Sequence, residues 1–177
     1  MSEAFEGIVA KCDGSDPINW FAGLQSALRL RLVHFGGDTW GIYHSAPRDL
    51  LMRTDEIEIL ARELSHAFPC LAVYYNNGCD VSESVLHRQG VVESTFGLDD
   101  ELWSLIDESG RVIEGSPRLL PADLDPDVEY DCVTTAIDLG LQTLGVASNA
   151  TEDLLKDAFT YDRLPIVLET HPRSAAG

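Results

Sequence analysis

Residues 74–90, YYNNGCDVSESVLHRQG, gather side-chain types that nucleophilic catalysis would use. Cys79 and two serines are nucleophile types, and Glu83 and His87 are the acid and base types that would have to lie within hydrogen-bond reach of them. Along one strand, however, Glu83 and His87 stand roughly 13 Å apart, because each residue advances the chain by about 3.3 Å. The chain also has no Gly-x-Ser-x-Gly elbow, phosphate-binding loop or dinucleotide motif. The sequence therefore predicts no catalytic residue.

Metal binding is the second chemistry that this region suggests. Four residues of ligand type lie in or beside it: His66, Cys70, Cys79 and His87. Zinc ligands usually come in closely spaced pairs, whereas Cys79 would lie roughly 20 Å from Cys70, at the opposite end of a hairpin. The acidic stretch at 123–131, DLDPDVEYD, imitates a calcium loop, but Val128 replaces its glycine and Thr134 its bidentate glutamate. We therefore expect neither a metal site nor a cofactor.

Glu83 is a candidate functional acid because of its expected surroundings. The predicted strand pairing places it on an apolar sheet face, between Ala72 and Phe96. An unpaired carboxylate is costly in such a place, and unusual acids tend to mark functional sites. Pairing with an arginine such as Arg62, or exposure at a sheet edge, would explain Glu83 without any function.

Charge is the most unusual property of the chain. Its thirty acidic and twelve basic residues give a net charge of −18, and eleven of the acids lie between Asp99 and Asp131 with two arginines to balance them. A field of this sign repels nucleic acids and anionic membranes and attracts basic proteins. The alternative role of the acidity is to keep the protein soluble.

The predicted binding surface combines acids of this segment with aromatic residues. Tyr and Trp are enriched where proteins bind one another, although aromatics at alternating strand positions usually belong to the core. The aromatic candidates are Trp40, Tyr43, Tyr74, Tyr75 and Trp103. From both groups, the candidate binding residues are Asp123, Asp125, Asp127, Glu129, Trp103 and Tyr74.

Hydrophobic periodicity predicts the elements that must position these residues. The expected strands are 5–12, a hairpin within 28–45, a three-stranded meander at 70–76, 79–87 and 91–96, and an edge strand at 163–169. The expected helices run from Asp16 to about Ala27, from Thr54 to Phe68, from Asp125 to Leu144, and from Asn149 or Thr151 past Phe159. Residues 97–121 carry mixed signals.

Two-residue turns at Asn77-Gly78 and Gln89-Gly90 would fix the register of the meander. One face then collects Cys70, Ala72, Tyr74, Val81, Glu83, Val85, His87, Val92 and Phe96. We expect this face to be the core, although a shift of one residue in either hairpin would exchange the two faces.

The element order β-α-β-β-α-β-β-β-α-α-β predicts one α+β domain, with a mostly antiparallel sheet (a hairpin and a meander) packed by two or three helices. The domain covers 1–177, and 171–177 form a disordered tail. The N-terminus lacks a basic and apolar leader, no apolar run has membrane-spanning length, and the four cysteines are widely spaced. These features predict a cytoplasmic protein with reduced thiols.

The leading functional hypothesis is a non-catalytic module that binds a basic protein, as an immunity protein or inhibitor would bind a basic enzyme. The alternative is an enzyme or small-ligand binder with a pocket between the sheet and the Asp125 helix, using Glu83, His87 or His44. A third hypothesis, a structural or assembly protein, predicts a stable oligomer.

Overall fold

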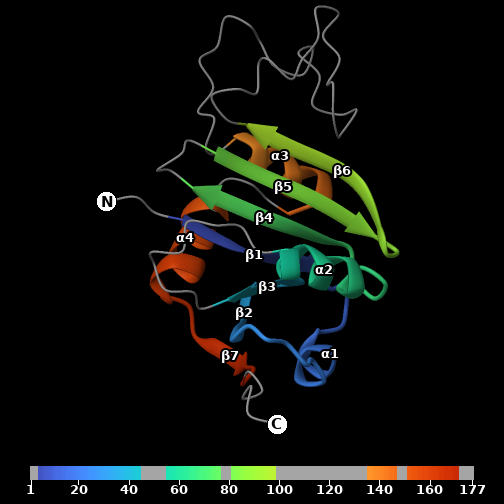
Figure 1. Cartoon of the computed structure of the whole chain (residues 1–177), viewed down its shortest axis with the longest axis vertical. Helices are drawn as coiled ribbons and strands as arrows, with labels where there is room; N and C mark the ends of the chain where they lie inside the picture. Colours follow the sequence, from blue (N-terminus) through green and yellow to red (C-terminus); the bar gives the residue numbers. More distant parts are fainter. Residues whose placement is uncertain (1–3, 45–54, 77–80, 99–134, 147–150, 172–177) are drawn as a thin grey trace, which may run out of the picture.

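A computed structural model describes residues 4–44, 55–76, 81–98, 135–146 and 151–171, which form one sheet and the helices around it (Figure 1). The sheet has seven strands in the order β6-β5-β4-β1-β3-β2-β7, and every neighbouring pair is antiparallel. The strands are β1 (Ala4–Lys11), β2 (Leu30–Gly36), β3 (Thr39–His44), β4 (Cys70–Asn76), β5 (Val81–Arg88), β6 (Val91–Leu98) and β7 (Ile166–Glu169). The helices of the described residues are α1 (Ile18–Ala22), α2 (Asp55–Leu64), α3 (Thr135–Leu144) and α4 (Thr151–Tyr161). The predicted α+β class is confirmed.

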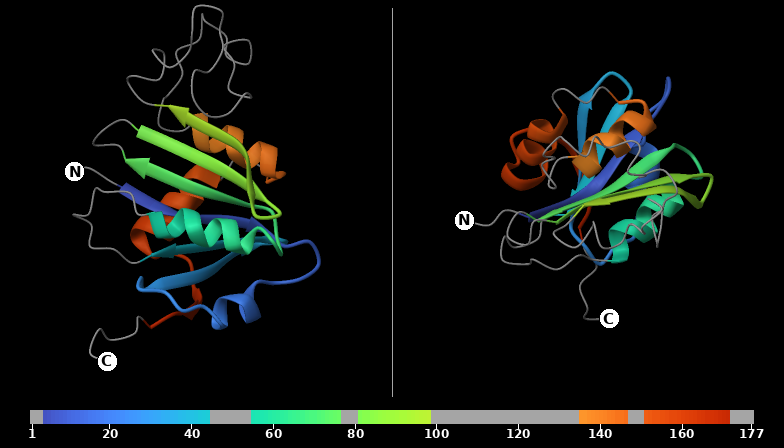
Figure 2. Two further views of the ribbon diagram at one scale, coloured as in Figure 1. Left: turned by 45° about the vertical axis from the view of Figure 1, so that its right-hand side comes forward. Right: turned by 90° about the horizontal axis from the view of Figure 1, so that it is seen from above.

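Helices cover both faces of the sheet, which is therefore the middle layer of three (Figure 2). On one face, Leu60 of α2 belongs to the same apolar cluster as Ile8 and Ala72. On the other face, Leu155 of α4 belongs to a second cluster with Val9 of β1. Because successive strand residues point to opposite faces, Ile8 belongs to the first cluster and Val9 to the second, and each is 0% exposed. The face expected to be the core does lie under α2, but the opposite face is equally buried.

The first hairpin of the meander has a different register from the predicted one. Strands β4 and β5 end on the pair Asn76↔Val81, whereas a two-residue turn at Asn77-Gly78 would have paired Asn76 with Cys79. The predicted register of this hairpin was therefore wrong by two residues. Since a shift of two preserves the alternation of side chains, the residues of β5 keep their predicted faces.

The second hairpin begins as predicted and then departs from the prediction. Its turn at Gln89-Gly90 is confirmed, with φ of 51° and 79°, as a type I′ turn requires. The register then shifts at Glu93, the extra residue of a β-bulge. Later residues of β6 consequently change face. Phe96 lies opposite Ser84 on the α3 side of the sheet, so its predicted place on the α2 side was wrong.

The helices differ in how closely they follow the sequence pattern. Helix α2 buries the predicted stripe of Ile57, Leu60, Ala61 and Leu64. Helix α1 starts one residue later than expected, at Ile18, with Pro17 rather than Asp16 at the N-cap, and it ends at Ala22 rather than near Ala27. The N–H of Ile18 bonds Asp16 Oδ1 at 2.9 Å. The helix is capped at Gly23, whose N–H bonds the carbonyls of Asn19 and Trp20.

Helix α3 approaches β5 so closely that only glycine fits at one contact. A Cβ on Gly140 would lie 2.2 Å from Ser84 Oγ, and Ser84 donates a hydrogen bond to the carbonyl of Ala136 at 2.7 Å. The helix stops at Gly145, which has a φ of 91° and whose N–H bonds the carbonyl of Leu141 at 3.0 Å. The predicted C-terminal stop at Gly145 is therefore confirmed, whereas the predicted start at Asp125 lies outside the described residues.

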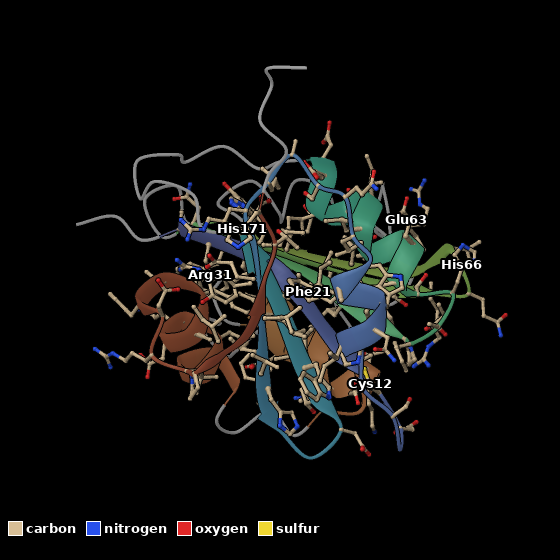
Figure 3. All side chains as sticks on the ribbon, turned by 90° about the horizontal axis from the view of Figure 1, so that it is seen from below. Cys12, Phe21, Arg31, Glu63, His66 and His171 are labelled. Carbon is tan, nitrogen blue, oxygen red and sulfur yellow. The ribbon has the colours of Figure 1, made fainter. Side chains whose placement is uncertain are left out.

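The C-terminal strand β7 forms the predicted edge and is held there by ion pairs. Arg29 and Arg31 both bind the carboxylate of Glu169, at 2.5 and 2.8 Å. Arg31, which Figure 3 shows between the strands and α4, also binds Asp162 at 2.5 Å. Hydrogen bonds from Arg31 and then Arg29 lower the pKa of Glu169. These contacts fasten β7 to β2, although surface ion pairs of this kind are individually weak.

Candidate functional site

Most of the residues predicted to bind a partner lie outside the described part of the chain. This applies to Asp123, Asp125, Asp127, Glu129 and Trp103. The predicted disordered tail also lies, beyond His171, outside the described residues. The role of the acidic segment therefore stays a prediction. Tyr74 and Glu83 are described, and both are partly exposed on the α2 side of the sheet.

The proposed aromatic patch does not form, because three of its members are core residues. Trp40, Tyr43 and Tyr75 are only 8%, 1% and 5% exposed. Tyr75 stacks on Phe5 with ring centroids 4.9 Å apart, and Tyr43 stacks on Phe159 at the same distance. Of the described aromatic candidates, Tyr74 alone keeps a partly exposed ring.

A row of polar side chains crosses the sheet where Tyr74 lies. Strand pairing sets Glu6 opposite Tyr74 and Tyr74 opposite Glu83, and His44 Nε2 lies 2.6 Å from Glu6 Oε1. These four residues, Glu6, His44, Tyr74 and Glu83, are called the polar row below. The predicted setting of Glu83 between Ala72 and Phe96 was wrong, because the corrected registers place it between Tyr74 and Gly97.

The contact between Glu6 and His44 is the chemically most capable part of the polar row. Both side chains are nearly buried, with exposures of 5% and 10%. A carboxylate that bonds one nitrogen of an imidazole fixes the orientation and tautomer of the ring, which prepares the other nitrogen to accept a proton or bind a ligand. Sequence reasoning missed Glu6. Its signal was a lone acid inside the apolar strand AFEGIVAK.

His87 is buried without any hydrogen-bond partner for its ring. Neither Nδ1 nor Nε2 has a partner in the described structure, and the residue is 0% exposed beneath α2. Burial lowers the pKa of His87; the nearby carboxylate of Glu58 acts in the opposite direction and Arg62 in the same one. Cys70 lies directly opposite on β4 and donates to the carbonyl of Ala61 at 3.0 Å. The arrangement holds a neutral imidazole in an apolar setting.

A surface pocket of about 530 Å³ lies where the C-terminal end of α2 meets the β5–β6 hairpin. It is called the hairpin pocket below and is lined by Ser65, His66, Ala67, Pro69, Arg88, Gln89, Val91 and Glu93. Figure 3 labels His66 at this junction, with Glu63 one turn earlier on α2. The alternative hypothesis placed a pocket between the sheet and the helix starting at Asp125, whose first part lies outside the described residues. The described part, α3, packs against the sheet in an apolar cluster containing Leu71, Ile137 and Leu141.

Acidic residues predominate in the described fold even without the segment at 99–134. The described residues comprise sixteen acids and seven bases, a balance of −9. Asp13, Asp16 and Asp38 are exposed together around Cys12, whose pKa is raised to about 12 by burial and then by these carboxylates. The thiol of Cys12 is therefore unreactive, and the surface around it is negative.

Comparisons with protein-family models, with curated proteins and with solved structures give no match to this chain. Within the described residues, no group of three or more histidine, cysteine and acidic side chains is arranged to hold a metal ion. No helix among them is long and apolar enough to cross a membrane.

Proposed function

We propose that this protein is a non-catalytic module that binds a basic protein, in the manner of an immunity protein or enzyme inhibitor. The observation that supports this most is the balance of −9 in the described fold, which adds to the acidic excess of residues 99–131. A field spread over the whole molecule steers a cationic partner from a distance and raises its association rate. The acids at Asp123, Asp125, Asp127 and Glu129, with Trp103 and Tyr74, are the proposed contacts.

The test compares two variants with the same change in net charge. One carries Asp123→Asn, Asp125→Asn and Asp127→Asn. The other carries Asp13→Asn, Asp38→Asn and Glu63→Gln, at exposed positions of the described fold. A basic protein is first captured with the wild type at low salt, identified, purified, and then titrated against all three proteins by calorimetry at several salt concentrations.

We expect the first variant to bind about three- to 150-fold more weakly, because three charge pairs at about 0.2–1 kcal/mol each are lost. The control variant should lose no more than about threefold, through weaker long-range attraction. Affinity that is independent of salt, or equal losses in both variants, would contradict the proposal. Equal losses would mean that net charge alone retains the partner.

A second candidate function, binding of a small polar ligand at the polar row, is favoured by the nearly buried contact between Glu6 and His44. Here His44 would accept a hydrogen bond or proton from the ligand while Glu6 orients the ring. A fragment screen by NMR on the wild type and on His44→Ala tests this idea, with the exposed His34→Ala as control. Hits that perturb Tyr74 and vanish only in His44→Ala support it. A screen whose hits all survive in that variant excludes it.

A further inference from the structure

We propose that the hairpin pocket binds a small organic carboxylate with an apolar body. This inference does not depend on the proposed function. It follows from three features of the pocket, which are a braced framework, an oriented arginine and an exposed apolar wall.

The framework of the pocket is braced by hydrogen bonds from the hairpin turn to one serine. The N–H of Gln89 bonds the carbonyl of Ser65, and the N–H of Gly90 bonds Ser65 Oγ, both at 2.9 Å. The ring of His66 packs so closely on Gly90 that an added Cβ there would lie 2.3 Å from Cε1 of the ring. The helix end and the hairpin turn are therefore joined before any ligand arrives, which lowers the entropic cost of binding.

The pocket contains one group that can bind an anion, the guanidinium of Arg88. Arg88 donates from Nε to Glu93 Oε2 at 2.6 Å, which orients its guanidinium. Among the described residues, this is the one acceptor of Arg88, so the two Nη groups remain for a ligand. A carboxylate matches the fork of two N–H donors on a guanidinium. His66 lines the same pocket, and its imidazole ring carries at least one N–H donor.

The other wall of the pocket is apolar and open to solvent. Val91 is 62% exposed, the largest exposure among the big apolar residues described, and Ala67 and Pro69 line the same pocket. A volume of about 530 Å³ lies in the range of about 300–1,000 Å³ that is typical of small-molecule sites. A ligand with an apolar chain would cover Val91 while its carboxylate binds Arg88.

The test uses two probes that share one apolar chain and differ in the charge of the head group. Hexanoate and hexylamine are titrated into the ¹⁵N-labelled full chain, and the amide shifts of Ala67, Gln89 and Val91 are followed. We expect saturable shifts with hexanoate, at a dissociation constant of about 1 mM for a ligand of this size, and none with hexylamine. Saturable binding of hexylamine, or no saturation with hexanoate, would overturn the proposal.

Three variants separate recognition by Arg88 from damage to the pocket. Arg88→Gln should weaken hexanoate binding about tenfold, because a charge-assisted hydrogen bond is lost. Glu93→Gln breaks the same ion pair but keeps the guanidinium, so its affinity should be unchanged or higher. Arg163→Gln removes an exposed arginine that is ion-paired with Asp157 elsewhere, and it should have no effect. Equal losses in Arg88→Gln and Glu93→Gln would show that the pair only shapes the pocket.

Discussion

Replacing the buried imidazole of His87 by leucine should stabilise the protein. A neutral imidazole has one N–H donor and one acceptor nitrogen, and in the described structure neither has a partner. Each unsatisfied buried group costs about 1–3 kcal/mol, whereas a leucine of similar volume carries no such penalty. Poorer fit of a branched chain in the space of a flat ring costs up to about 1.5 kcal/mol. The two groups together cost about 2–6 kcal/mol, so after the poorer fit the net expectation for His87→Leu is a free energy of unfolding that is larger by about 0.5–6 kcal/mol at pH 7.

The assay is urea denaturation of the wild type and the variant at a series of pH values. Because burial lowers the pKa of His87 from its usual 6.5, the unfolded chain takes up a proton before the folded protein does. As far as His87 is concerned, the free energy of unfolding of the wild type should therefore be constant above about pH 6.5. Below that pH it should decrease, by at most about 1.4 kcal/mol per pH unit. His87→Leu lacks this contribution, so its advantage should grow as the pH drops from 7 to 5.

The exposed His171→Leu is the matched control, with an expected change within about 0.5 kcal/mol. A His87→Leu variant that is less stable than the wild type would refute the reasoning, because the ring nitrogens would then have to be bonded in solution. An advantage that stays constant between pH 7 and 5 would refute the electrostatic part alone.

Three further predictions concern a turn, an acid and a thiol. Gly90→Ala should cost about 1–3 kcal/mol more than Gly14→Ala, because both residues have positive φ but only Gly90 is crowded, by His66; paired urea curves measure the difference. Because two arginines lower the pKa of Glu169, the stabilisation that its carboxylate gives is fully present above pH 4.5 and is lost as the pH falls through the lowered pKa. Glu169→Gln should therefore lose less stability on acidification than the wild type, as unfolding followed by circular dichroism would show. With a pKa of about 12, Cys12 should resist iodoacetamide at pH 8 in the folded protein and react in urea, as peptide mapping would show.

Local patterns in the sequence were enough to predict the element order and the buried stripe of α2. That helix repeats apolar residues at three- and four-residue spacing, from Ile57 to Leu64, and no competing signal interrupts them. The contact between Glu6 and His44 was beyond such reasoning, because it joins residues 38 positions apart through the pairing of two strands. The early end of α1 at Gly23 was missed because the apolar spacing continues past this residue, whereas glycine disfavours the interior of a helix.

The wrong face was predicted for Phe96 because of a β-bulge, which the alternation of residues in the sequence does not reveal. With regular pairing, Glu93 would sit opposite Leu86, which is 0% exposed on the α3 side, and a carboxylate would enter that apolar layer. The bulge puts Ser94 there instead, at the smaller cost of one hydroxyl without a partner. It also turns Phe96 into the α3 layer, where it is 3% exposed, and leaves Glu93 in solvent beside Arg88. The ion pair that orients the arginine of the hairpin pocket is thus a consequence of excluding a charge from the core.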